Sequence, residues 1–192
     1  MEIDWQIVEK WATRIAAHDL ADLRRVFGDK GARGPEIIWQ PDPEQLFAPQ
    51  LRFLHDYWSI LAAARPMPIA WEIDPLEMKP ALGYVMLVDL VRGGEDFRYR
   101  LYGSRVAAIS GFDVTGRLVS EHPASAYIIE FTLALYRAAL RRRLPVFSAH
   151  GPPATLHTAA WHRLVLPLAD ATGEVMRFLV GIVPIAYNGR PL

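Results

Sequence analysis

With 192 residues the chain has the length of one domain with an extension, and no stretch of it is apolar for long enough to span a membrane. Its 21 Lys and Arg residues balance 21 Asp and Glu residues, so no overall field draws it to nucleic acid or to an anionic membrane. Cysteine is absent, which excludes disulfides and thiolate chemistry and, with a first segment unlike a signal peptide, leads us to expect a cytoplasmic protein.

The first part of the chain, residues 1–49, is predicted to be a helix followed by a linker. Apolar residues at three- and four-residue spacing over 4–27 predict an amphipathic helix, and the spacing slips near Asp19, where a break into two helices is indicated. Glycine and proline between 28 and 49 oppose regular structure, so we expect the linker there.

The rest of the chain is predicted to mix helices and strands, as a domain over 50–187 with a short tail at 188–192. Helical spacing covers 51–64 and 124–143. Strands are expected at 84–91, 97–102, 145–150, 158–168 and 175–185. These elements give an α+β fold with a five-stranded antiparallel sheet and helices on one face. Because the last strand is apolar on both sides, the other face needs cover from the N-terminal helix or from a second copy of the chain.

Four local sequences occur in an order that resembles PAS domains: LHDYWSILAAARPMPIAWEIDPLEM, FRYRLYGS, ISGFDVTGRLVSE and WHRLVLPLADATGEV. They resemble the successive blocks of the alphaproteobacterial single-domain family called PAS type 5, over about residues 50–187. The resemblance implies a sheet that cups a small cavity, used for sensing or for protein contact and usually without catalysis. At Trp161-His162 the sequence departs from the aromatic and acidic pair expected in many relatives, so ligand chemistry shared at that pair is not expected.

The resemblance also implies where a cavity lies. The apolar residues at those positions are Tyr99, Ile109, Phe112, Ile128, Phe131, Phe147 and Phe178. The candidate polar contacts are Arg100, Tyr102 and His162, because a pocket arginine can hold a carboxylate. Plain core packing and cross-strand ion pairing are the alternative interpretations. We therefore expect a small apolar ligand or, alternatively, a filled core that serves as a scaffold, and the sequence requires no cofactor.

Metal binding and catalysis are not predicted. His150, His157 and His162 lie near one another in the sequence, but their spacings do not match a familiar zinc pattern. No serine stands in a nucleophile-elbow motif, and no glycine cluster has the spacing of a phosphate-binding loop. The sequence therefore assigns no catalytic residue and no metal ligand.

Two functions of different classes remain. The leading hypothesis is a non-enzymatic sensory or interaction module in bacterial signalling, acting as a homodimer and through an unidentified signalling protein. The residues expected on the dimer or partner surface are Trp5, Val8, Trp11, Ile15, Trp161 and Leu179. The alternative is a small cavity-fold isomerase or hydrolase that uses His162 with Asp89 or Glu174 as acid and base. His162 at the floor of an enclosed pocket would favour the enzyme, and His162 on a surface would favour the module.

Overall fold

The computed structural model describes residues 2–151 and 158–192 of the chain. Within these residues the α-helices are α1 (Trp5–Ala16), α2 (Ala21–Asp29), α3 (Pro49–Ala62), α4 (Ser104–Ser110) and α5 (Ala126–Arg142). The strands are β1 (Glu36–Trp39), β2 (Val85–Val91), β3 (Asp96–Leu101), β4 (Val146–His150), β5 (Thr158–Ala169) and β6 (Val175–Ala186). They form a six-stranded sheet in the order β1-β4-β5-β6-β2-β3, in which every neighbouring pair is antiparallel. The α+β class is as expected, with one more strand.

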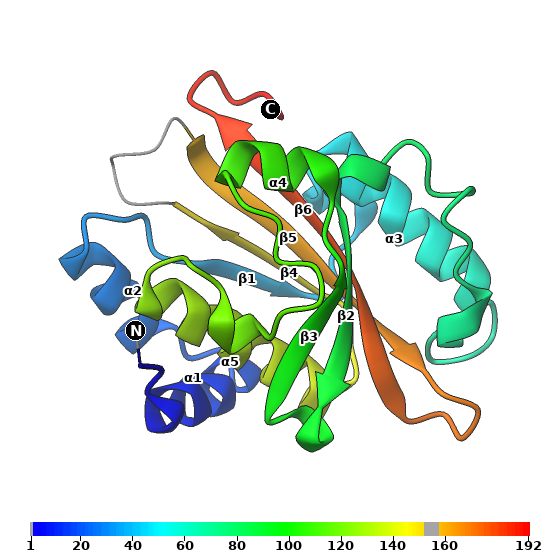
Figure 1. Ribbon diagram of the computed structural model, residues 1–192, viewed down its shortest axis with the longest axis horizontal. Helices are drawn as coiled ribbons and strands as arrows, with labels where there is room; N and C mark the ends of the chain where they lie inside the picture. Colours follow the sequence, from blue (N-terminus) through cyan, green and yellow to red (C-terminus); the bar gives the residue numbers. More distant parts are fainter. Residues whose placement is uncertain (1, 152–157) are drawn as a thin grey trace.

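The predicted N-terminal helix is two helices, and the break falls where the apolar spacing slips. Asp4 caps α1, because its Oδ1 accepts hydrogen bonds from the backbone N–H groups of Gln6 (2.9 Å) and Ile7 (3.1 Å). The apolar side of α1 packs on α5. Glu9 on α1 also forms ion pairs with arginines of α5, the shorter one, to Arg141, at 2.6 Å. This layer covers α5, and α5 covers one face of the sheet (Figure 1).

The opposite face of the sheet is covered by α3, so the prediction of helices on one face is wrong (Figure 1). Trp58 Nε1 donates a hydrogen bond to the carbonyl oxygen of Pro167 in β5 (2.8 Å). At Gly181 in β6, a Cβ atom would lie 2.6 Å from the side chain of Leu51 and 2.7 Å from that of Leu54. The absence of a side chain at Gly181 therefore lets α3 lie directly on the sheet.

The sixth strand, β1, lies in the segment that the sequence predicted to be a linker. Ile37 and Ile38 of β1 pair with Ser148 and Phe147 of β4 at the edge of the sheet. The apolar run of β1 is too short to give a recognisable alternation, and the glycines and prolines around it dominate the sequence pattern. The N-terminal part of the chain thus contributes a strand as well as helices, which corrects the five-stranded prediction.

Candidate functional site

A cavity of about 450 Å³ lies on the α5 face of the sheet, between the strands, α4 and the first turn of α5. Its apolar lining residues are Met86, Val106, Ile109, Phe112, Ala124, Ile128, Trp161, Ile182 and Leu192. Its polar lining residues are Tyr99, Tyr102, Ser110, His122, Ser125, His150, Thr158 and Arg163. This size and this mixture of apolar walls with a few polar groups are typical of small-molecule sites.

A tight turn after α4 holds the wall that β3 contributes. Asp113 Oδ1 accepts hydrogen bonds from the backbone N–H (2.9 Å) and the hydroxyl (2.7 Å) of Thr115. Gly116 follows with a φ of 83°, a conformation that glycine adopts without a Cβ penalty. The turn then pairs with β3, since Gly116 N donates to Tyr99 O (2.6 Å) and Tyr99 N donates to Arg117 O (3.0 Å). The backbone of Tyr99 is thereby fixed where its ring lines the cavity.

Four of the seven residues expected to form the pocket line this cavity: Tyr99, Ile109, Phe112 and Ile128. They come from β3, from α4 and the residues after it, and from the first turn of α5. These elements follow one another in the chain, and the fold places the four side chains around one cavity.

The other three expected pocket residues are packed elsewhere. Phe131 is buried in α5, and the Phe178 ring packs against Tyr136 with 5.7 Å between ring centroids, so both fill the core beneath α5. Phe147 points to the α3 face, because side chains alternate along a strand, and its ring lies 5.4 Å from that of His162. These three aromatic side chains therefore pack in the core and do not line the cavity.

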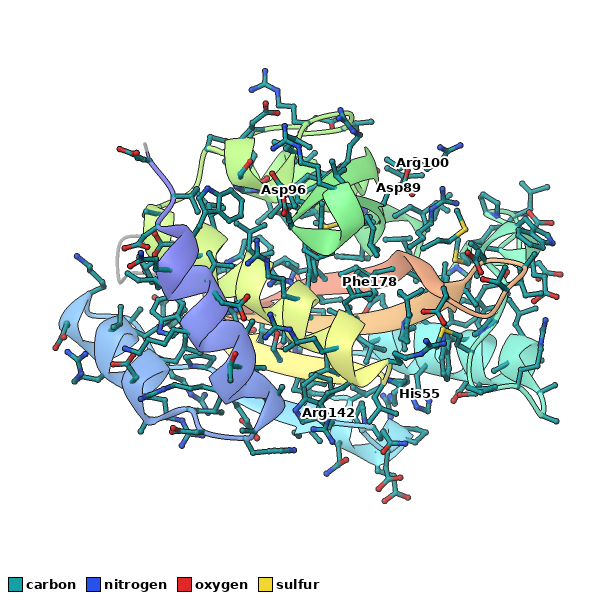
Figure 2. All side chains as sticks on the ribbon, turned by 90° about the horizontal axis from the view of Figure 1, so that it is seen from below. His55, Asp89, Asp96, Arg100, Arg142 and Phe178 are labelled. Carbon is teal, nitrogen blue, oxygen red and sulfur yellow. The ribbon has the colours of Figure 1, made fainter. Side chains whose placement is uncertain are left out.

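Of the expected polar contacts on β3, Tyr102 lines the cavity and Arg100 does not. Tyr102 follows the last residue of β3, Leu101, so the strand's alternation no longer determines its direction. Arg100 lies exposed near the edge of the molecule, with its Nη1 atom 3.8 Å from Asp89 Oδ2 (Figure 2). The cross-strand ion pair is therefore the interpretation of Arg100 that the structure supports.

His162 lies on the α3 face of the sheet, away from the cavity. Its ring lies between those of Phe47 (6.4 Å between centroids) and Phe147 (5.4 Å). Asp89 and Glu174 each form an ion pair with an arginine instead. The acid and base pair of the enzyme hypothesis is therefore not formed.

Six polar side chains of the cavity were not assigned to it from the sequence: Ser110, His122, Ser125, His150, Thr158 and Arg163. Arg163 is 6% exposed, and its Nη1 donates a hydrogen bond to Thr132 Oγ1 of α5 (3.1 Å). The sequence signal was present in the alternation of β5, which places Arg163 on the same side as Trp161 in a strand whose other residues are mostly apolar. His122 lies in a loop without a motif, and no local pattern marks it.

The histidines of the cavity are neutral at pH 7. Burial, followed by the positive charge of Arg163, lowers the pKa of His122 to about 4. Burial, followed by the same charge, lowers the pKa of His150 to about 3. Burial also raises the pKa of Tyr102 to about 12 and that of Tyr99 well above its usual range, so both phenols keep their protons. Among the described side chains that line the cavity, the permanent charge is that of Arg163.

A comparison with protein-family models matches residues 46–183 to the family described as PAS domain. This span covers well over half of the chain. The chain belongs to the PAS domain family. The resemblance drawn from the four sequence blocks is thereby confirmed. No curated protein and no solved structure matches the chain.

The PAS domain and its N-terminal helices bury most of the expected partner surface inside the chain. The buried members are Val8, Trp11, Ile15 and Leu179. The first three belong to the side of α1 that packs on α5, so the apolar stripe of α1 finds its partner within the same chain. Trp161 lines the cavity, and Trp5 is 42% exposed with the Arg137 guanidinium 5.3 Å from its ring centroid. These residues therefore do not form one continuous outer surface.

Neither a metal site nor a membrane-spanning helix is found within residues 2–151 and 158–192. In that part of the chain, no group of three His, Asp or Glu residues could hold a metal ion. His157, one of the three histidines considered from the sequence, lies outside the described residues. None of the described helices is both long enough and apolar enough to cross a membrane.

Proposed function

We propose that this PAS domain is a non-enzymatic sensory module that binds a small molecule in its cavity and passes the bound state to a signalling protein. The observation that carries the proposal is the cavity of about 450 Å³, with mostly apolar walls and a small set of polar groups. The family supports a sensory or interaction role.

The cavity is placed so that its occupancy can act on the outer helices. Ile128 in the first turn of α5 lines the cavity, and α1 packs along α5. Arg137 and Arg141 of α5 join the two helices through ion pairs with Glu9. A ligand that binds one packing of α5 and α1 better than another would shift the balance between them.

The interaction half of the proposal rests on exposed apolar side chains near α3. Ile60, Trp71 and Leu76 are all largely exposed on the surface. Large apolar residues at the surface are common at protein contacts when they gather into patches. We propose that the chain forms a homodimer or contacts a signalling protein through the region of Ile60, Trp71 and Leu76.

The test compares two tryptophan substitutions by native mass spectrometry. Ile128→Trp places a larger side chain into the cavity, whereas Ile60→Trp adds the same ring on α3, where Ile60 is 77% exposed. The unmodified chain, incubated with a panel of small apolar compounds, should retain an adduct that is lost on denaturation. Ile128→Trp should lose this adduct, and Ile60→Trp should keep it.

Absence of any adduct from the unmodified chain would refute the ligand-binding function. An adduct that persists in Ile128→Trp would place the ligand outside the cavity. The same spectra report the assembly mass, so a monomer at every concentration would remove the homodimer from the proposal.

A further inference from the structure

Arg163 occupies the cavity wall in an unusual electrostatic position. It is 6% exposed, yet only one hydrogen bond holds its guanidinium among the described residues, from Nη1 to Thr132 Oγ1 (3.1 Å). Its Nε is buried without an acceptor in that part of the structure. The guanidinium also lies 5.9 Å from the ring centroid of Tyr136. These contacts orient the side chain but leave most of its donors unused.

No Asp or Glu side chain forms an ion pair with this charge. All Asp and Glu residues lie in the described part of the chain, since residues 1 and 152–157 contain none, and no Asp or Glu side chain there comes within 4.0 Å of Arg163. The two buried carboxylates are engaged elsewhere. Asp96 Oδ2 accepts from the Ser120 hydroxyl (2.6 Å), and Glu130 Oε1 accepts from the backbone N–H of Asp4 (3.1 Å).

The neighbours of Arg163 in the sheet are uncharged, and a neutral histidine lies in the same cavity. Its direct neighbours across the strands are Ser148 in β4 and Ile182 in β6. His150 lines the same cavity and is neutral at pH 7, and its Nδ1 is buried without a hydrogen-bond partner among the described residues. A buried cation without a counter-charge is strongly unfavourable, so an anion that enters the cavity would be stabilised there.

We propose that Arg163 binds the carboxylate of a small acid whose apolar body fills the rest of the cavity. This inference rests on the proposed ligand-binding function and names the chemical class of the ligand. A guanidinium and a carboxylate match in a planar, bidentate geometry, which favours a carboxylate at this position. His150 and the protonated Tyr99 and Tyr102 lie in the same lining and supply further hydrogen-bonding groups.

The remaining walls define the body of the acid. Met86, Val106, Phe112 and Ile182 provide aliphatic and aromatic surface, and no lysine or acidic side chain occurs among the described lining residues. A single cation in such walls favours one negative group on an otherwise apolar molecule. A linear monocarboxylate of medium length meets both conditions and fits the size class of the cavity.

The experiment titrates the full chain with linear monocarboxylates from butanoate to dodecanoate and with the matched alcohols, by isothermal titration calorimetry. Arg163→Met keeps much of the side-chain length but removes the charge. We expect the best acid to bind the unmodified chain more tightly than its alcohol and to bind Arg163→Met at least about thirtyfold more weakly. The alcohol should bind both forms with similar affinity. Arg100→Met, which removes an exposed arginine outside the cavity, should leave the acid's affinity unchanged.

The outcomes separate this inference from the function on which it rests. If acids bind no better than alcohols, or bind Arg163→Met as well as the unmodified chain, the role of Arg163 is refuted while cavity binding stands. If neither acids nor alcohols bind the unmodified chain, the inference about the ligand class is refuted, and the native mass spectra decide separately whether the cavity binds any small molecule. An equal loss in Arg100→Met would show a general effect of charge and would also refute the inference.

Thermal melting without ligand tests a purely structural role for Arg163. Because its charge is uncompensated, Arg163→Met should melt at the same or a higher temperature than the unmodified chain. A structural role predicts a clear decrease instead. If Arg163→Met does not fold, Arg163→Lys retains the charge without the planar fork, and it should weaken acid binding while leaving alcohol binding unchanged. Unchanged acid binding in Arg163→Lys would contradict bidentate recognition.

Discussion

At the scale of single residues, the cavity combines a fixed positive charge with two imidazoles that the fold keeps neutral. His150 packs against the rings of Phe27 (5.9 Å between centroids) and Phe131 (5.3 Å), which deprives its charged form of water. The ring centroid of His122 lies 4.9 Å from that of Phe112, and the positive charge of Arg163 also lowers the pKa of His122. Protonating either histidine would place a second positive charge in an apolar space beside the first, which explains the low pKa values.

Because the pKa values of both histidines are lowered in the folded chain, we expect the free energy of unfolding to decrease in mild acid. Their pKa values fall from 6.5 in the unfolded chain to about 4 for His122 and about 3 for His150 in the folded chain. Between these values the unfolded chain binds more protons, so their contribution to stability is complete above pH 6.5 and is lost as the pH falls toward the folded pKa. The expected slope is about 1.4 kcal/mol per pH unit for each histidine between roughly pH 6 and pH 4.

Urea unfolding of the unmodified chain and of His150→Phe and His122→Asn, measured across this pH range, tests the prediction. Phenylalanine keeps the ring contacts of His150, and the asparagine side chain can accept the hydrogen bond that His122 Nδ1 takes from Ala124 N (3.2 Å). Each variant should show a smaller slope than the unmodified chain. The comparison is needed because burial raises the pKa of Glu130, whose protonation acts in the opposite direction. Parallel curves for all three proteins would refute this assignment.

At the scale of elements, alternation and helical spacing predicted the type of each segment, helix or strand. They did not predict equally well which face of the sheet each helix covers. The five expected strands and the helix over 51–64 correspond to β2 to β6 and α3. The sheet's need for cover on both faces was also predicted, but the helix over 4–27 or a second copy of the chain was expected to cover the second face. That choice depends on contacts between distant segments, which no local spacing encodes. Gly181 is the local feature that indicates where α3 packs, because a glycine inside an apolar strand often marks a close approach of another element.

The contact at Gly181 leads to a prediction with an internal control. In Gly181→Ala the new methyl group would lie 2.6 Å from a methyl carbon of Leu51 and 2.7 Å from one of Leu54, so these buried side chains, or α3 with them, must shift away from β6. We expect a loss of about 1–3 kcal/mol in the free energy of unfolding. Gly28→Ala changes a helical glycine whose new methyl group would have no neighbour within 4 Å, so it should stabilise the protein by about 0.5–1 kcal/mol. Denaturant unfolding of both variants measures the difference, and equal stabilities would show that α3 does not press on the sheet.

The same limit explains which parts of the site could be predicted. The family resemblance led us to expect Tyr99, Ile109, Phe112 and Ile128 at a cavity, and these four line the cavity of the structure, since position in a known element order carries that information. Arg163 was overlooked because a lone charge in a strand is read as solvated until the face it lies on is known. The expected aromatic residues that lie outside the cavity are of the same type as those that line it, and only packing distinguishes the two groups.

At the scale of the whole molecule, the residues that precede the family match are part of the fold. The match begins at residue 46, whereas β1 is paired with β4 in the same sheet and α1 and α2 pack on α5. Arg142 of α5 lies over the Trp39 ring of β1 (4.4 Å to the centroid), which ties these two layers together. Without the N-terminal part, the apolar side of α5 facing α1 and the edge of β4 would be open to water.

Cleavage of the chain in the exposed segment after β1 tests this integration. Asp42, Pro43, Glu44 and Gln45 are exposed, so a protease recognition sequence inserted after Glu44 can be cut in the folded protein. We expect the two fragments to remain together on size-exclusion chromatography and to separate only in denaturant, because Val8, Trp11, Ile15 and Phe27 are buried within the core. The C-terminal fragment produced alone should aggregate, since an apolar helix face and a strand edge are uncovered at once. Dissociation of the N-terminal fragment, leaving a folded and monomeric remainder, would instead show that residues 1–44 are a separable extension.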